Sequence, residues 1–189
     1  MSRWTSIALQ WALMVLLSAF LFAQFFRLND QLFGFAQHTQ DINWIFLPAG
    51  FRVLLVLVLD IPGALGIAVA GLWLNIDRLD HTTLPFILAT GLVSGFGPWC
   101  VKYIMQKRGL LGPDLTHLSS SSLLQFVLFY AAVNAISHQL IFWGFSPESS
   151  RPWVDVWPMF VGDLTGALLV LYAFKLGLPW LTGLFQSRR

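Results

Sequence analysis

Charged residues are scarce in this chain of 189 residues. Only 11% of the residues are Asp, Glu, Lys or Arg, whereas about 25% are charged in an ordinary soluble domain. The hydrophobic share is 57%, and no polar stretch is long enough to build a second, soluble domain. The composition therefore excludes an ordinary soluble protein and predicts a single integral membrane domain over residues 1–189.

Cysteine and catalytic motifs are also scarce. Cys100 is the one cysteine, which excludes an intrachain disulfide and a cysteine-cluster metal site. A net charge of +2 is too small to indicate a nucleic-acid partner. The sequence contains no HExxH, GxSxG, P-loop or dinucleotide-binding glycine motif. We therefore predict no enzymatic activity, no cofactor and no metal.

Long apolar segments are what the chain has instead. A spanning helix needs about 20 mostly apolar residues, and nine Trp and seventeen Phe are typical of aromatic belts at two membrane interfaces. The predicted fold class is all-α, a polytopic transmembrane helix bundle of about six spans. The predicted spans cover residues 7–26, 42–59, 62–76, 85–103, 121–145 and 157–176. We expect Asp60, between the second and third spans, to cap the helix that follows.

The basic residues predict the orientation of these spans, because cytoplasmic loops are enriched in Lys and Arg. Six spans and a cytoplasmic N-terminus place seven basic residues inside and three outside. The inner set is Arg3, Lys102, Lys107, Arg108, Lys175, Arg188 and Arg189, and the outer set is Arg27, Arg78 and Arg151. The sequence therefore predicts that both ends lie in the cytoplasm and that the first span is an anchor rather than a cleaved signal peptide.

Three predicted spans carry ionisable residues at a similar depth. Arg52 lies roughly 12 Å below the outer interface, His138 roughly 10 Å and Asp163 roughly 9 Å, with Asn134 one turn below His138. Charges inside a membrane usually face a partner or a cavity. One interpretation is a buried polar site that holds a small-molecule ligand. The other is a structural Arg52–Asp163 pair, with His138 bonded to a backbone carbonyl.

Small residues and prolines recur next to this polar set. Gly162 and Gly166 have the GxxxG spacing that lets helix backbones approach, and we expect both to face another helix within the bundle rather than a second copy. Pro48 and Gly50 should loosen or kink the second span just above Arg52. The backbone groups freed there either line a cavity or belong to a simple tolerated kink, which is the commoner case. His38, His81 and His138 are too widely separated to predict a metal site.

Two stretches of this sequence carry short motifs of aromatic, proline and glycine residues. The first is NWIFLPAG at 43–50, followed by PGALG at 62–66 and LWLN at 72–75, and the second is Trp157 followed by GDLTGALLV at 162–170. Both stretches resemble the bacterial MASE family of membrane-associated sensor domains. The resemblance implies a multi-pass protein of the bacterial inner membrane. It also marks the positions most expected to matter, which are Trp44, Pro48, Gly50, Trp157, Gly162, Asp163 and Gly166.

Members of that family usually precede a histidine kinase or a cyclic-di-nucleotide enzyme, whereas this sequence ends at Arg189. The first functional hypothesis is therefore a sensory or regulatory membrane module that signals through a partner protein. The second is a small-solute binding or transport subunit, which a polar cavity open to the outside would favour. The third is a structural subunit of a larger membrane complex.

Overall fold

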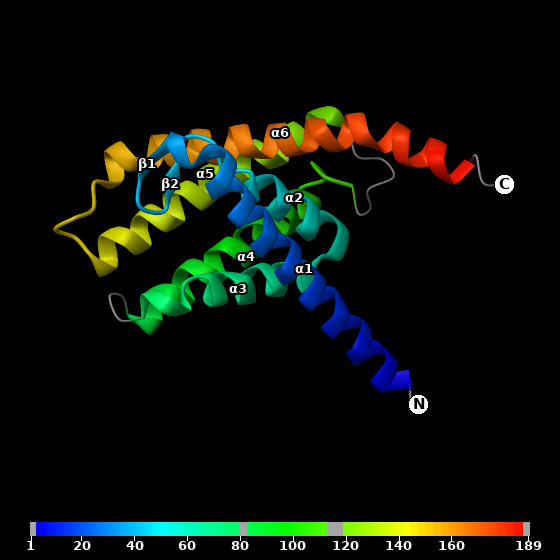
Figure 1. Cartoon of the computed structure of the whole chain (residues 1–189), viewed down its shortest axis with the longest axis horizontal. Helices are drawn as coiled ribbons and strands as arrows, with labels where there is room; N and C mark the ends of the chain where they lie inside the picture. Colours follow the sequence, from blue (N-terminus) through cyan, green and yellow to red (C-terminus); the bar gives the residue numbers. More distant parts are fainter. Residues whose placement is uncertain (1–2, 80–82, 113–118, 187–189) are drawn as a thin grey trace.

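Helices make up most of the chain that the structure describes, which is residues 3–79, 83–112 and 119–186 of a computed structural model (Figure 1). Side chains are described for 4–79, 83–112 and 119–177. The α-helices in these ranges are α1 (Arg3–Phe33), α2 (Pro48–Leu59), α3 (Ile61–Leu74), α4 (Leu84–Lys107), α5 (Ser120–Phe145) and α6 (Pro152–Gln186). The predicted all-α fold class is confirmed.

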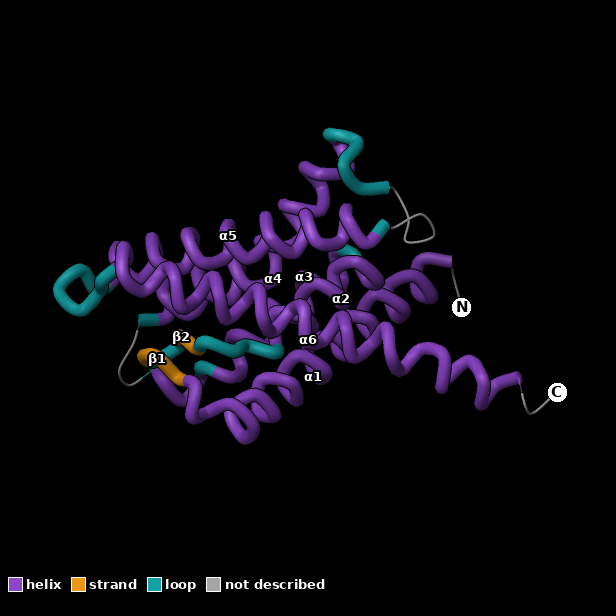
Figure 2. Tube along the Cα trace, turned by 90° about the horizontal axis from the view of Figure 1, so that it is seen from above, coloured by secondary structure: helices purple, strands orange, loops and turns teal. Residues whose placement is uncertain are grey.

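Short elements connect the first helices. After α1 come the 3-10 turn η1 (Gly34–Ala36) and a hairpin of strands β1 (Gln37–Thr39) and β2 (Ile42–Asn43), and a second turn, η2 (Ile76–Arg78), follows α3. The hairpin, η2 and the α5–α6 loop at 146–151 lie at one end of the molecule, which we call the hairpin end (Figures 1 and 2). Both termini point toward the opposite end, which we call the terminal end.

Four helices are long and apolar enough to cross a membrane, counting only the described residues. They cover Trp4–Ala36, Leu84–Lys107, Ser120–Phe145 and Pro152–Gly177. The helices α2 and α3 have 12 and 14 residues, so they reach only about 18 and 21 Å, against a hydrocarbon core about 30 Å thick. The bundle therefore combines four full-length helices with two short apolar ones.

The prediction of a helix over 42–59 is wrong in its first third. Ile42 and Asn43 belong to β2, residues 44–47 are irregular, and α2 begins at Pro48. Proline has no N–H to donate and a fixed φ, so it suits the first position of a helix and not its interior. The second predicted span is therefore a non-helical segment, 42–47, followed by a half-length helix. The segment begins in β2, and we call it the extended segment.

This extended segment is held by side chains and backbone of other elements. The Phe46 N–H donates to the Gly162 carbonyl oxygen over 3.1 Å, and the Leu47 N–H donates to Asn29 Oδ1 over 2.9 Å. The Thr165 hydroxyl donates to the Trp44 carbonyl oxygen over 3.0 Å. Backbone groups released from a helix are therefore satisfied inside the protein, as an apolar environment requires.

Gly162 and Gly166 do not face another helix, as the spacing predicted, but the backbone of this extended segment. A Cβ atom on Gly162 would collide with the Asn43 carbonyl oxygen, and one on Gly166 with the Phe46 carbonyl oxygen. The expectation that these glycines serve packing within the chain is confirmed, and the partner is corrected. Segment 42–47 lies against α6 because both glycines lack a side chain.

The corner between α2 and α3 also differs from its prediction. Asp60 does not cap α3 with its side chain. Its carboxylate instead accepts hydrogen bonds from Lys102 Nζ over 2.9 Å and from Trp99 Nε1 over 3.0 Å. Lys102 also donates to the Val56 carbonyl oxygen over 3.2 Å, so α4 holds the C-terminal end of α2 in place.

Replacing Gly166 by alanine should lower the stability of the purified protein in detergent. The new methyl group would meet the Phe46 carbonyl oxygen, and forcing extra volume into a packed contact costs about 1–3 kcal/mol. The matched control is Gly144→Ala in α5, where the new methyl group would have no neighbouring atom within 4 Å. Thermal unfolding should show a lower midpoint for Gly166→Ala and no loss for Gly144→Ala. Equal midpoints would contradict this packing.

Candidate ligand-binding site

The side chain of Arg52 lies at the centre of the bundle. Arg52 stands on the first turns of α2, directly after the extended segment, and is 6% exposed. The rings of Phe22 and Phe46 lie 5.3 and 5.1 Å from its guanidinium carbon. Aromatic faces attract a cation, and the attraction is stronger where water is excluded. These two rings leave the edge of the guanidinium group available to polar partners.

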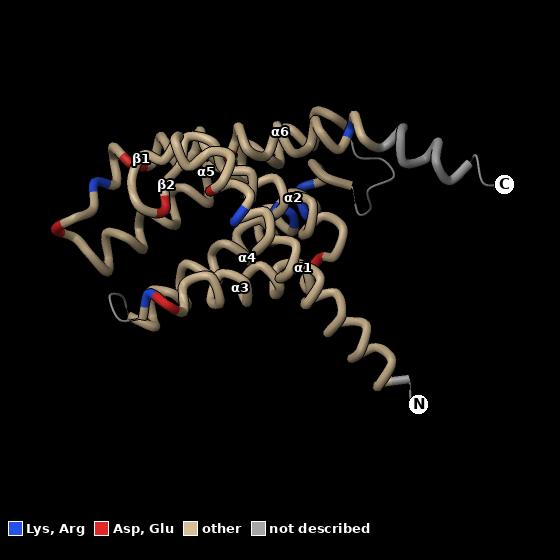
Figure 3. Tube along the Cα trace, viewed as in Figure 1, with Lys and Arg blue, Asp and Glu red and all other residues tan. Residues whose placement is uncertain are grey.

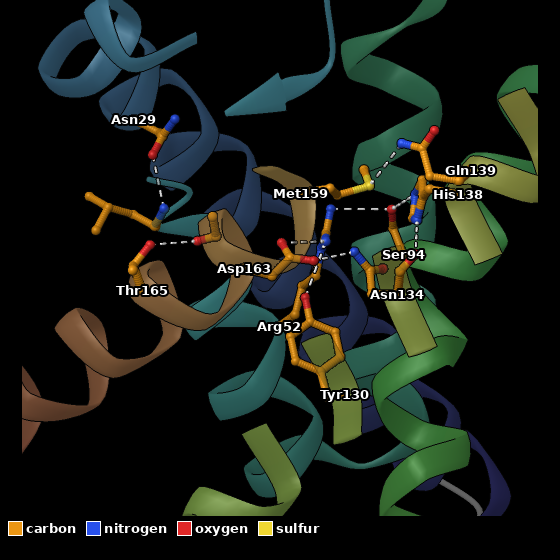
Figure 4. Close-up of polar contacts among 12 residues, drawn as sticks. Asn29, Arg52, Ser94, Tyr130, Asn134, His138, Gln139, Met159, Asp163 and Thr165 are labelled. Carbon is orange, nitrogen blue, oxygen red and sulfur yellow. Dashed lines mark hydrogen bonds and ion pairs between the residues drawn. The ribbon is translucent and has the colours of Figure 1, made fainter. Parts of the chain in front are cut away.

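Polar groups from three other helices meet that edge (Figure 4). Arg52 Nη1 lies 3.9 Å from Asp163 Oδ1 on α6 and donates to the Tyr130 hydroxyl on α5 over 3.2 Å. Arg52 Nη2 donates to Ser94 Oγ on α4 over 3.3 Å. The Nε atom has no hydrogen-bond partner within the described part of the chain. The predicted Arg52–Asp163 ion pair is therefore confirmed, and Arg52 keeps unused donor capacity.

His138 and Asn134 extend this network along α5. His138 Nδ1 lies 2.9 Å from the Asn134 carbonyl oxygen, and His138 Nε2 lies 3.3 Å from Ser94 Oγ. A carbonyl oxygen only accepts, so we assign the proton of a neutral imidazole to Nδ1. Ser94 then donates to Nε2 while accepting from Arg52. The Asn134 side-chain amide donates to Asp163 Oδ2, which closes the network.

The network forms the floor of a cavity of about 90 Å³. Arg52, Ser94, His138 and Asp163 line its deep part. Its remaining lining comes from α1, the hairpin, η2 and the facing helices: Phe22, Phe26, Asp41, Asn43, Phe46, Gly71, Leu74, Asn75, Arg78, Phe86, Thr90, Gly91, Phe142 and Met159. The cavity therefore extends from the buried ion pair toward the hairpin end.

A second ion pair stands at the hairpin end of the cavity. Arg78 on η2 donates to both carboxylate oxygens of Asp41, each over 2.8 Å, and also to Asn75 Oδ1 over 2.7 Å. The hydrogen bond with Asp41 raises the pKa of Arg78 above its usual value, so the guanidinium group stays charged at neutral pH. The two side chains are 27% and 33% exposed, which places this pair at the mouth.

Comparisons with protein-family models, curated proteins and solved structures give no match. The chemistry of the site therefore rests on its own geometry. A serine beside a histidine can form a nucleophilic dyad, but Ser94 Oγ already accepts a hydrogen bond from the Arg52 guanidinium. That bond withdraws electron density from the oxygen and weakens it as a nucleophile. The arrangement is better suited to hold a small polar molecule than to attack one.

All four predicted site residues meet in one place. Arg52, Asp163, His138 and Asn134 are each buried and joined by the contacts described above. The structural alternative for His138, a hydrogen bond to a backbone carbonyl oxygen, is confirmed as well. The same ring also lines the cavity, so the two interpretations are compatible. Depth along the helices was therefore a sound guide to which polar residues meet.

The positions marked by the family resemblance have different structural roles. Pro48 starts α2 and Gly50 packs against Val170, while Trp44 offers its carbonyl oxygen to Thr165. Gly162 and Gly166 support the extended segment. Trp157 is 65% exposed and takes no part in the cavity. Of the marked positions, Asp163 lines the cavity, while Trp44, Pro48, Gly50, Gly162 and Gly166 shape the backbone around it.

The site also contains residues that the sequence did not predict, namely Ser94, Tyr130 and the Arg78–Asp41 pair. Ser94 lies between Gly91 and Gly95, and both glycines pack closely against the backbone of α3. A polar residue inside such a close-packed segment was a usable signal. Tyr130 and Asp41 gave no signal, because tyrosine is common in membrane helices and aspartate is common in turns.

Among the described residues, the one histidine besides His138 is His38, which does not line the cavity. His38 Nε2 lies 3.1 Å from Asp155 Oδ1 at the hairpin end, and His81 lies outside the described residues. Within the described ranges, no group of three or more His, Cys, Asp or Glu residues is placed to hold a metal ion.

Removing either charge of the buried pair should destabilise the protein, because an unpaired charge in a membrane helix costs a few kcal/mol. Arg52→Leu and Asp163→Leu should each lower the midpoint of unfolding in detergent. The double variant should lose less than the sum of the two, by about 0.5–3 kcal/mol, because it leaves no orphaned charge. The control is Arg78→Leu combined with Asp163→Leu, whose losses should add. Additive losses for Arg52 and Asp163 would mean that the two charges are not coupled.

Proposed function

We propose that this chain is a multi-pass membrane protein that crosses the bilayer six times and keeps both termini in the cytoplasm. Successive helices run back and forth between the hairpin end and the terminal end (Figures 1 and 2). In this proposal α1, α4, α5 and α6 are full-length transmembrane helices. Two further crossings are made by shorter elements inside the bundle, one by α3 and one by segment 42–47 together with α2. Their short length is tolerated because other helices, rather than lipid, surround much of them.

The charge distribution supports this orientation. The described basic residues beyond the terminal end of α4 and along α6 are Lys107, Arg108 and Lys175, and acidic residues concentrate at the hairpin end (Figure 3). Lys and Arg are enriched in cytoplasmic loops. The terminal end is therefore assigned to the cytoplasm, and the mouth of the cavity to the outside.

A reporter enzyme that is active only outside the cytoplasm tests this orientation. Fused after Arg189, it should be inactive, and fused within the loop at 146–151 it should be active. A cytoplasm-specific reporter at the same two positions should give the opposite pattern. Strong outside activity after Arg189 would contradict the six-crossing arrangement.

For the activity, we propose that the chain binds a small polar solute that enters from the outside. The observation that carries this proposal is the cavity whose floor holds a buried, incompletely paired Arg52. Ionisable groups inside a membrane usually mark solute or ion pathways, and a concave site with a few converging polar groups is the usual form of a small-molecule site. A polar network that served only to fix helix packing would need no cavity beside it. The polar residues that line the cavity outside this network therefore favour solute binding.

What the bound solute does is a second part of the proposal. The MASE-type resemblance favours a sensory module that signals through a partner protein, and it stays a prediction. One structural feature supports it. Arg52 stands on α2, and the other end of that short helix is held by Asp60 and Lys102 near the terminal end. A shift of Arg52 on binding would therefore be passed through one rigid helix. The alternative is a subunit that delivers the solute for transport.

Solute binding can be detected as thermal stabilisation of the purified protein. A ligand present at 100 times its Kd should stabilise the folded state by about 2.7 kcal/mol. We expect at least one member of a panel of amino acids, small carboxylates, amides and polyols to do so. Thr90→Trp, which fills the cavity, should abolish the effect. Leu92→Trp, on the exposed face of the same helix, should retain it.

The panel also gives the outcome that contradicts the proposal. If no solute stabilises the wild type, or if the stabilisation survives Thr90→Trp, the cavity is not the binding site and the network serves packing alone.

A further inference from the structure

We propose that the ligand of this cavity is a small zwitterion, with one carboxylate and one ammonium group, of the size of the smallest α-amino acids. This inference rests on the proposed solute-binding function and names the class of solute. It follows from the balance of charge around the cavity, from the two charged groups on its floor, and from its volume.

The lining of the cavity is electrically balanced. It contains two arginines, Arg52 and Arg78, and two aspartates, Asp163 and Asp41. His138 contacts the Asn134 carbonyl oxygen through Nδ1 and Ser94 Oγ through Nε2, and it adds no charge to the lining because a second cation buried beside the Arg52 guanidinium would be unfavourable. A net charge is costly to bring into a low-dielectric interior unless an opposite charge compensates it. A balanced site therefore favours a ligand whose own charges sum to zero.

The floor offers donors for a carboxylate. Arg52 is 6% exposed, its Nε has no hydrogen-bond partner among the described residues, and its guanidinium carbon lies over the rings of Phe22 and Phe46. A guanidinium group presents five N–H donors in one plane, and carboxylates match that geometry. The donors that Arg52 does not use inside the protein are therefore suited to a carboxylate.

The floor also offers an acceptor for an ammonium group. Asp163 uses Oδ2 to accept from Asn134, while Oδ1 faces Arg52 at 3.9 Å. Charge-assisted hydrogen bonds between such groups are normally about 2.7–2.9 Å long, so the pair is too loose to satisfy both partners. Each group can therefore take up a charge-assisted bond to a ligand.

The spacing of these two groups selects a ligand with adjacent charges. Arg52 and Asp163 lie side by side on the floor, so a carboxylate on one and an ammonium on the other must be close together in the ligand. An α-amino acid carries both groups on one carbon atom. A cavity of about 150 Å³ holds a benzene ring, and this one measures about 90 Å³. The volume therefore suits glycine or alanine better than an amino acid with a long side chain.

The test compares glycine with molecules that carry only half of its chemistry. Glycine, acetate, methylammonium and acetamide are each titrated into the full chain in detergent, and binding is measured by calorimetry and thermal shift. Glycine should bind at least tenfold more tightly than any of the other three, and alanine should bind while leucine does not. Glycine binding should disappear in Thr90→Trp and persist in Leu92→Trp.

A charge variant gives a second, independent readout. Asp163→Asn retains the shape of the side chain and removes its charge, so glycine affinity should fall at least tenfold while acetate affinity rises. If this variant does not fold, the comparison of the four molecules on the wild type remains the test.

The outcomes separate this inference from the function on which it rests. If acetate or acetamide binds as tightly as glycine, and Thr90→Trp abolishes that binding, the cavity is a solute site but its ligand is not a zwitterion. If none of the four molecules and no other solute of the panel binds, the zwitterion and the binding function are both wrong.

Discussion

The burial of one guanidinium group is the constraint on which the rest of this structure depends. Arg52 is 6% exposed inside an apolar helix bundle, where an unpaired charge is very unfavourable. Its partners come from four other helices: Phe22 from α1, Ser94 from α4, Tyr130 from α5 and Asp163 from α6. Satisfying this single charge therefore fixes how the helices stand against one another, and the polar groups gathered for that purpose also form the floor of a cavity.

The late start of α2 follows from the same requirement. Arg52 can reach the centre of the bundle because α2 begins only at Pro48, after an extended segment that lies directly on α6. Such a segment exposes N–H and C=O groups that lipid cannot satisfy. Gly162, Asn29 and Thr165 supply the missing partners. The glycine spacing on α6 and the proline at the start of α2 are therefore two parts of one arrangement.

The sequence predicted the helical class and the contact among Arg52, Asp163, His138 and Asn134. A charged residue in an apolar helix must face another polar group, and this sequence has few of them at the same depth. It did not predict the length of α2 or the true partner of Gly162 and Gly166. Hydropathy is the same for an apolar helix and an apolar extended segment, and small-residue spacing does not reveal whether a helix or a strand lies opposite. The Arg78–Asp41 pair was missed for a related reason, since it joins a turn to a hairpin, where periodicity carries no information.

In the proposed function, Arg52 and Asp163 form the floor of a polar cavity that dissolved solutes reach from the hairpin end. The most direct measurement is the rate at which a small, membrane-impermeant thiol reagent modifies a cysteine introduced at Thr90, in a Cys100→Ser background. Thr90 lines the cavity, and its hydroxyl donates to the carbonyl oxygens of Phe86 and Ile87 on its own helix. Added from the outside, the reagent should modify Thr90→Cys much faster than Leu92→Cys, which faces away from the cavity on the same helix, and glycine should slow the reaction. Equal rates at the two positions would contradict the account.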